Sequence, residues 1–97
     1  MRILALESDL KPIPEDARND ILRREAAAAW KLQQADVVRE IFMAEGGTKA
    51  VLVLECAGLA EARSRLASLP LVEEGYTEFA LYALEPYPGY ARLFAPD

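Results

Sequence analysis

The sequence has no histidine and a single cysteine, Cys56, and each scarcity excludes a class of chemistry. Without histidine the chain offers no His-ligated zinc or haem, no Ser-His or Cys-His nucleophile pair, and no imidazole as general base near neutral pH. Cys56 cannot form a disulfide within the chain, and at the end of an apolar stretch we expect it to be a small buried hydrophobe. Glycine-rich phosphate loops, metal-ligand spacings and nucleophile elbows are absent too. We expect no metal and no cofactor, and any chemistry must use carboxylates, tyrosine, lysine or arginine.

Basic runs and long apolar runs are also missing. Acidic residues outnumber basic ones by 16 to 11, for a net charge of -5, whereas nucleic acids and anionic membrane surfaces are bound through clustered Lys and Arg. No apolar run is long enough to span a bilayer, and Glu7 interrupts the first one too early for a signal peptide. The sequence predicts a cytoplasmic protein that binds neither nucleic acid nor membrane.

What the chain does have is a hydrophobic content of 53% in 97 residues, enough for one domain spanning residues 1–97. Apolar residues recur at helical spacing in two segments and at strand spacing in four. Pro14-Glu15-Asp16 is typical of a helix start, because proline lacks an amide and acids suit the positive end of the helix dipole. Pro70 is expected to end the second helix. The predicted elements are a strand at 2–7, a helix at 14–34, strands at 37–44 and 49–56, a helix at 59–69 and a strand at 76–85.

This order of elements is the split βαβ pattern and predicts an α+β fold, the ferredoxin-like βαββαβ sandwich. Two helices then cover one face of a four-stranded antiparallel sheet, and the acids of the first helix are expected to lie in solvent. The other face is apolar, and an exposed apolar face of that size marks an interface, here with a second copy of the chain. It carries Leu4, Leu6, Phe42, Val51, Val53, Tyr82 and Leu84.

The hairpin between residues 37 and 56 is expected to turn at Gly46-Gly47, because a two-residue turn requires positive φ angles. Alternation then points Arg39 and Glu40 to opposite faces, with Arg39 toward the first helix or its end. The register pairs Ile41 with Leu52, Glu40 with Val53 and Arg39 with Leu54.

The C-terminal segment, residues 86–97, is rich in aromatics, but its prolines prevent it from continuing a strand. We expect this tail to dock on the partner subunit through Tyr87, Tyr90, Arg92 and Phe94. A lid over a cavity mouth is the alternative.

Three stretches carry a resemblance to a known family: Ala29-Trp30-Lys31-Leu32, Val38-Arg39-Glu40-Ile41-Phe42 and Leu69-Pro70-Leu71-Val72. In these, and in the order of its elements, the chain resembles the dimeric α/β barrel superfamily, in its muconolactone isomerase-like and YciI-like branch. The resemblance implies that two sheets pack face to face around a cavity. Members include cofactor-free isomerases, small monooxygenases, haem enzymes and proteins with no known reaction. The histidine that marks typical YciI-like sites is missing here, and haem ligation through histidine is excluded for the same reason.

Six residues are candidates for a site in such a cavity. Glu40 shares its predicted face with Val38, Phe42, Val51 and Val53, and Glu78 shares one with Tyr76 and Tyr82. Enclosure among apolar groups makes a carboxylate a better proton acceptor near neutral pH, so Glu40 and Glu78 are the candidate catalytic residues. The candidate substrate-binding residues are Tyr76, Tyr82, Trp30 and Phe42.

Structural roles remain open for each of these residues. The two glutamates can instead pair with Arg39, Arg2 or Lys49, and the aromatic side chains can simply fill the barrel or the dimer contact. The sequence thus predicts a small-molecule-binding homodimer, acting without cofactor as an isomerase that moves a proton on a small organic acid or lactone. The alternatives are a non-catalytic binding or assembly module and a cofactor-free monooxygenase.

Overall fold

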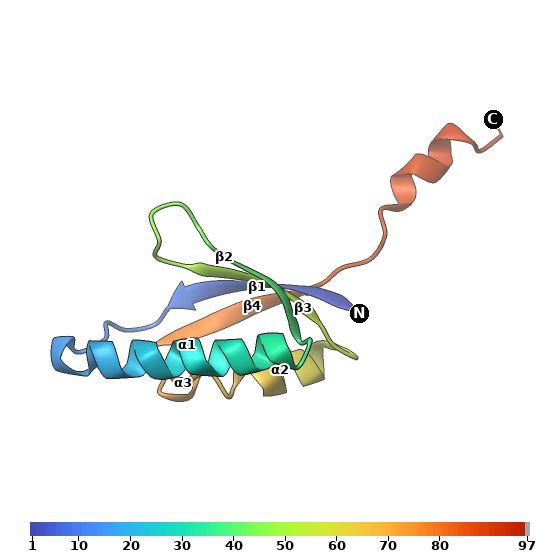
Figure 1. Cartoon of the computed structure of the whole chain (residues 1–97). Coiled ribbons are helices and arrows are strands. Elements are labelled where there is room, and N and C mark those ends of the chain that lie inside the picture. The colour runs from blue at the N-terminus through green and yellow to red at the C-terminus, as the bar shows by residue number, and fades with distance from the viewer. Residues whose placement is uncertain (97) are drawn as a thin grey trace.

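An antiparallel sheet of four strands forms the centre of the protein in the computed structural model, which describes residues 1–96. In Figure 1 the helices α1, α2 and α3 all lie on one side of this sheet. The strand order is β2-β3-β1-β4, which confirms the ferredoxin-like arrangement. The strands are β1 (Arg2–Asp9), β2 (Val38–Met43), β3 (Ala50–Glu55) and β4 (Thr77–Ala83).

The helices begin and end close to the predicted positions, with one correction at Pro70. The second predicted helix ends early, at Leu66, and Pro70 begins a separate short helix rather than ending one. Leu69 is extended, with φ -72° and ψ 126°, as the residue before a proline prefers, and proline fits the first helical turn because that turn needs no amide. The helical segments are η1 (Glu15–Ala17), α1 (Arg18–Gln34), α2 (Leu59–Leu66), α3 (Pro70–Glu73) and η2 (Pro88–Leu93).

The hairpin has the predicted register over most of its length. Ile41 pairs with Leu52 and Glu40 with Val53, as expected. The turn is longer than the expected two residues: the Ala44 amide donates to the Lys49 carbonyl at 2.8 Å, so residues 45–48 form the loop. Because the loop takes an equal number of residues from each strand, the register is preserved.

A β-bulge at Arg39 corrects the other end of this hairpin. Val38, not Arg39, pairs with Leu54, and the pairing shifts between Val38 and Glu40. Val38 therefore turns to the helix side, where it is buried, instead of sharing the face of Glu40. The Arg39 guanidinium donates from Nε to the Asp36 carbonyl, at 2.9 Å, just beyond the end of α1.

The hydrophobic core lies between the helix side of the sheet and helices α1 and α2. Alternation along β1 and β3 buries Ile3, Ala5, Leu52 and Leu54, and burial of each large aliphatic side chain contributes about 1.5–3 kcal/mol. Cys56 is buried at the edge of this core, as predicted, and burial raises the pKa of its thiol.

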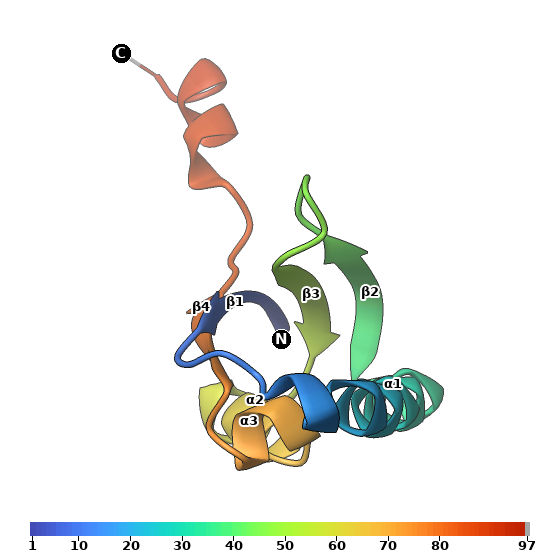
Figure 2. The same cartoon turned by 90° about the vertical axis from the view of Figure 1, so that its left-hand side faces the viewer.

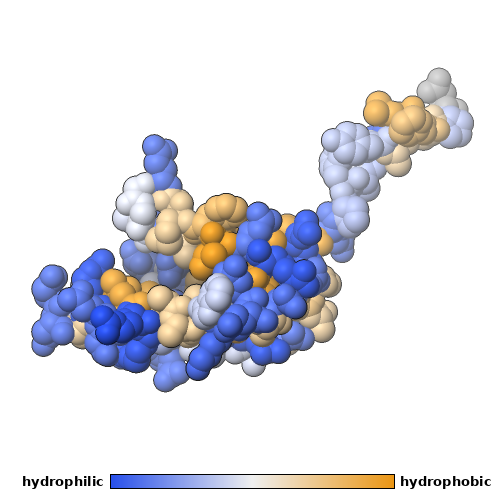
Figure 3. Space-filling view, in the orientation of Figure 1, coloured by the Kyte–Doolittle hydropathy of each residue, from blue (hydrophilic) through white to orange (hydrophobic). Residues whose placement is uncertain are grey.

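On the other face of the sheet, no helix formed by residues 1–96 packs against the strands (Figure 2). Cross-strand pairing arranges its side chains in rows. One row holds Glu40, Val53, Leu4 and Tyr82, and the next holds Phe42, Val51, Leu6 and Ala80. We call this surface the open face; Figure 3 shows apolar side chains gathered between α1 and the hairpin, and again on the tail.

The tail beyond β4 projects away from the domain (Figure 1), and its last residue, Asp97, lies outside the described residues. The radius of gyration is 16.4 Å, against about 12.5 Å for a compact chain of this length, and the longest extent is 65 Å. Among residues 1–96, no helix combines the length and hydrophobicity that a bilayer crossing requires.

Candidate functional site

A cleft of about 720 Å³ opens at the end of the sheet where β1 ends and β4 begins. Its walls come from β1, the β1–α1 connection, the start of α1, the β2–β3 hairpin and α3. The polar lining residues are Glu7, Asp9, Lys11, Arg18, Thr48 and Thr77, and the apolar ones include Leu10, Ile13, Leu22, Met43 and Leu71.

Glu7 is a buried carboxylate on the wall of this cleft. It follows Ile3 and Ala5 on the helix side of β1, and only 9% of it is exposed. Its Oε1 accepts the Ala50 amide at 2.9 Å, just beyond the last backbone pair of β1 and β3, Leu6 with Val51. A charged group this deeply buried requires such a partner, because burial of an unpaired charge is costly.

Glu25 is a second carboxylate on the helix side, behind the cleft wall. It is half-buried on α1, and its Oε1 accepts the Leu71 amide at 2.9 Å in the first turn of α3. Burial raises the pKa of Glu25, the Leu71 amide opposes this rise, and the charge of Glu7 adds to it. The expectation that all acids of the first helix lie in solvent is therefore wrong for Glu25.

Thr77 places an unpartnered hydroxyl on the same wall. It is the first residue of β4, pairs with Asp9, and lies on the helix side with Glu7. Only 5% of it is exposed, and its buried Oγ1 has no hydrogen-bond partner among residues 1–96. A buried polar group left unsatisfied costs about 1–3 kcal/mol, so a water or ligand group that reached this hydroxyl from the cleft would stabilise the fold.

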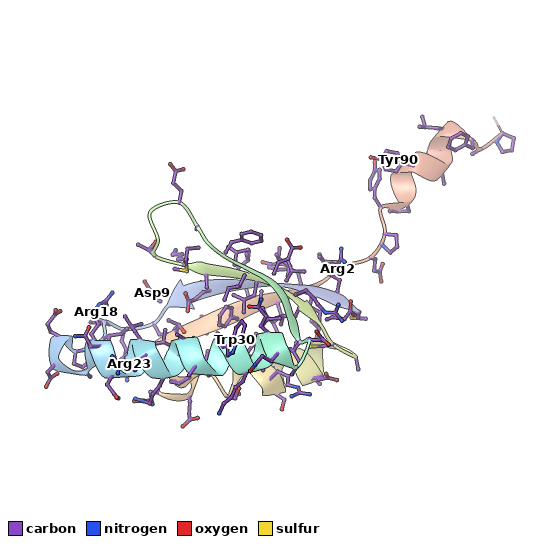
Figure 4. The ribbon with its side chains drawn as sticks, in the orientation of Figure 1. Arg2, Asp9, Arg18, Arg23, Trp30 and Tyr90 are labelled. Carbon is purple, nitrogen blue, oxygen red and sulfur yellow. The ribbon has the colours of Figure 1, made fainter. Side chains whose placement is uncertain are left out.

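Two cationic side chains, Lys11 and Arg18, also line the cleft. The Lys11 ammonium lies 4.8 Å from the centroid of the Tyr76 ring, a cation–π contact that anchors the side chain. Arg18 begins α1, and Figure 4 shows it at the same end of the molecule as Asp9. An anionic group on a ligand would find these two opposite charges here, together with the like charges of Asp9 and Glu7.

The cleft therefore combines a buried carboxylate (Glu7), a second carboxylate (Asp9), a buried hydroxyl, two cations and an apolar wall. This set suits a small, partly apolar molecule that carries an oxygen anion, and the carboxylate can exchange a proton with it. Within the described residues, no three His, Cys, Asp or Glu side chains gather to hold a metal ion.

The candidate catalytic glutamates lie elsewhere, on the open face. Glu40 is on β2 and Glu78 on β4, the two edge strands, so three strand spacings of roughly 14 Å in total separate the strands. Both side chains are exposed in the single chain. The structure thus puts them on one face without bringing them together.

The candidate aromatic residues divide between three places. Tyr82 and Phe42 lie exposed on the open face, opposite Leu4 and Val51. Trp30 projects from α1 and is exposed (Figure 4). Tyr76, just before β4, holds the Lys11 ammonium at the edge of the cleft.

Sequence reasoning did not single out Glu7, Glu25 or Thr77 as site residues. Alternation along the first strand, with Leu4 and Leu6 on the open face, does place Glu7 on the helix side, and the spacing of apolar residues along the first helix gives a signal for Glu25. It lies four residues after Ile21 and three before Ala28, on the stripe that faces the sheet. Nothing local marks Thr77, because its missing partner is a property of the folded cleft.

Two solved structures resemble this fold over most of their length. The crystal structure of muconolactone isomerase superposes with a TM-score of 0.76 and 18% sequence identity, over 91% of this chain and 92% of that chain. The chain has the fold of muconolactone isomerase. A second match is the 5-chloro-2-hydroxyhydroquinone dehydrochlorinase of Burkholderia phenoliruptrix AC1100, in complex with 2,5-dihydroxybenzoquinone. Its TM-score is 0.66 at 17% identity, over 88% of this chain and 94% of that chain.

The resemblance to muconolactone isomerase seen in the sequence is thus confirmed at the level of fold. No protein-family model matches the sequence, and the comparison with curated proteins gives no match. Because one fold hosts many activities, the function of this chain must be argued from its own cleft.

Proposed function

We propose that this chain binds a small organic acid, lactone or quinone-like molecule in the cleft and moves a proton on it without a cofactor. The observation that carries the proposal is the buried Thr77 hydroxyl, which has no partner in the described part of the chain and lies on the same cleft wall as the buried carboxylate of Glu7. Such a hydroxyl lowers stability unless a ligand satisfies it. The muconolactone isomerase fold and the quinone held by the dehydrochlorinase support this class of ligand.

Each polar group of the cleft then has a role in proton transfer. Glu7 takes a proton from a carbon next to a carbonyl group and returns it to another carbon of the same conjugated system, so no net proton is gained or lost. Thr77 donates a hydrogen bond to the carbonyl oxygen, where negative charge develops. Lys11 and Arg18 pair with the anionic group of the ligand.

The open face supports a homodimer. Phe42, Tyr82 and Leu84 are exposed on it beside four partly buried apolar residues, and a second copy of the sheet would cover them all. The pairing would also enclose Glu40 and Glu78. That enclosed space is the second candidate site. It is favoured by the row of open-face side chains in which Glu40 lies with Leu4 and Tyr82, and the base would be Glu40 or Glu78.

Proton exchange observed by NMR in D₂O, with muconolactone as the probe, tests the proposal. We expect the protein to catalyse the replacement of hydrogen by deuterium next to the carbonyl. Glu7→Gln should lower this rate at least about 100-fold, the usual contribution of a general base. Thr77→Val, which preserves shape but removes the donor, should lower it at least about tenfold. Glu85→Gln, an exposed glutamate beyond β4, is the matched control.

The variants Glu40→Gln and Glu78→Gln decide between the two candidate sites. If one of them abolishes exchange while Glu7→Gln retains it, the site is the enclosed space and not the cleft. Titration with 2,5-dihydroxybenzoquinone gives a readout that needs no turnover. Binding should shift the amide signals of Lys11 and Thr77, and a protein that neither exchanges protons on the first probe nor binds the second contradicts the proposal.

A further inference from the structure

The ammonium group of Lys11 is held in one place at the edge of the cleft. Its Nζ lies over the Tyr76 ring, 4.8 Å from the centroid. The end of the same side chain lies against the backbone of Gly75, where a Cβ atom would be 3.9 Å from Nζ and 4.0 Å from Cε. Two neighbouring residues of the turn between α3 and β4 therefore fix the position of a charge that a long side chain alone would leave mobile.

Backbone hydrogen bonds join the same two segments. The Leu10 and Lys11 amides both donate to the Tyr76 carbonyl, at 2.8 and 3.4 Å, and the Tyr76 amide donates to the Leu71 carbonyl at 2.8 Å. Pro12 follows Lys11 and favours an extended backbone there. The β1–α1 connection is thus fastened to the start of β4, and Tyr76 contacts both the backbone and the side chain of Lys11.

The cations of the cleft are not neutralised by ion pairs. Among residues 1–96, neither Lys11 nor Arg18 forms a salt bridge, although Glu7 and Asp9 line the same cleft. The formal charges of these four side chains sum to zero. A ligand with one anionic group can therefore meet Lys11 while the cleft gains a single negative charge. A second anionic group would add a further negative charge near the two carboxylates and would be repelled.

We propose that Tyr76 is a positioning residue for Lys11, and that together they select ligands with a single carboxylate or similar anionic group. A lysine that pairs with an anion loses conformational freedom, and a lysine already held by a ring and by Gly75 has lost part of it beforehand. Tyr76 itself does not touch the ligand in this role. The inference rests on the proposed function, because it concerns the same cleft, and it adds the charge of the ligand and the residue that selects it.

Ring-current shifts in the NMR spectrum report the position of Lys11 without any ligand. The ε-methylene protons of Lys11, assigned by their loss in Lys11→Met, should resonate upfield of those of Lys31, an exposed lysine on α1. Tyr76→Phe keeps the ring and should keep this displacement, whereas Tyr76→Leu should remove it. Circular dichroism shows whether both variants fold. Lys11 signals that coincide with those of Lys31 in the parent protein would overturn the positioning role.

Three probes with the same ring and different charges measure the selectivity: benzamide is neutral, benzoate carries one negative charge and terephthalate carries two. The parent protein should bind benzoate at least about tenfold more tightly than benzamide, as expected for a hydrogen bond to a charged group. Terephthalate should bind no more tightly than benzoate. Lys11→Met should remove most of the preference for benzoate, and Lys31→Met is the matched control.

The two Tyr76 variants separate positioning from a general effect on the cleft. Tyr76→Leu should weaken benzoate binding about three- to tenfold, the usual cost of ordering one long side chain, and leave benzamide binding unchanged. Tyr76→Phe should bind both probes as the parent does. Equal weakening of benzoate and benzamide in Tyr76→Leu would overturn the positioning role, because damage to the cleft affects both probes.

These outcomes are distinct from failure of the proposed function. A protein that prefers benzoate, depends on Tyr76 for this preference and exchanges no proton on muconolactone supports the inference and contradicts only the proposed reaction. Benzoate binding that is no tighter than benzamide binding overturns the inference, whatever the exchange experiment shows. Terephthalate binding that is tighter than benzoate binding overturns the selection of a single charge.

Discussion

At the scale of single residues, the carboxyl group of Glu25 makes the stability of the fold depend on pH. Its pKa is raised, so the folded state holds this proton more tightly than the unfolded state, and stability falls as pH rises from about 4 to 7. Glu25→Gln keeps an acceptor for the Leu71 amide without the charge. We therefore expect the variant to be more stable than the parent at pH 7, by less than about 1 kcal/mol because solvent screens a half-exposed group.

Urea unfolding between pH 4 and 7.5 measures this difference, with Glu85→Gln as the exposed control. The advantage of the Gln variant should shrink as pH falls, since the parent carboxyl becomes neutral as well. A Gln variant that is less stable than the parent at pH 7 but not at pH 4 would show that ionised Glu25 stabilises the fold. Local sequence could not reveal this role, because the amide partner Leu71 lies 46 residues away along the chain.

At the scale of elements, the hairpin depends on two glycines with positive φ angles. Gly46 has φ 95° and Gly47 has φ 69°, and at both residues a Cβ atom would project into open space. Gly46→Ala should destabilise the fold by about 1 kcal/mol, because a side chain at this φ is strained. Gly47→Asn should cost less, since asparagine tolerates the left-handed region. If chemical unfolding shows that both variants lose the same free energy of unfolding, strain of the backbone at Gly46 is not the cause.

The same hairpin shows which features of an element can be predicted. Gly46-Gly47 located the turn, and the register of Ile41 and Glu40 followed from it because side chains alternate with a fixed period. The bulge at Arg39 did not follow, since an extra residue leaves no mark in an apolar pattern that fits either register equally well. Its stabilising contact, the Asp36 carbonyl, depends on how α1 ends.

At the scale of the whole molecule, the order of elements was sufficient to predict the sandwich and its open face, whereas the cleft depends on loops. Glu7, Lys11 and Thr77 come from three segments that meet only in the folded chain. The apolar rows of the open face, by contrast, follow directly from alternation along four strands. Surfaces built from regular elements are therefore more predictable than sites built at their ends.

The open face leads to the last prediction, on assembly. Tyr82 lies in the row with Leu4 and Glu40, where a second sheet would cover it. Tyr82→Glu would bury a charge without a partner in the dimer but leave it in water in the monomer, so it should shift the equilibrium toward monomer at least tenfold. Sedimentation at micromolar concentration measures the shift.

Because the side chain is exposed in the single chain, circular dichroism should show that the variant still folds. A variant that folds and dimerises like the parent would place the interface elsewhere.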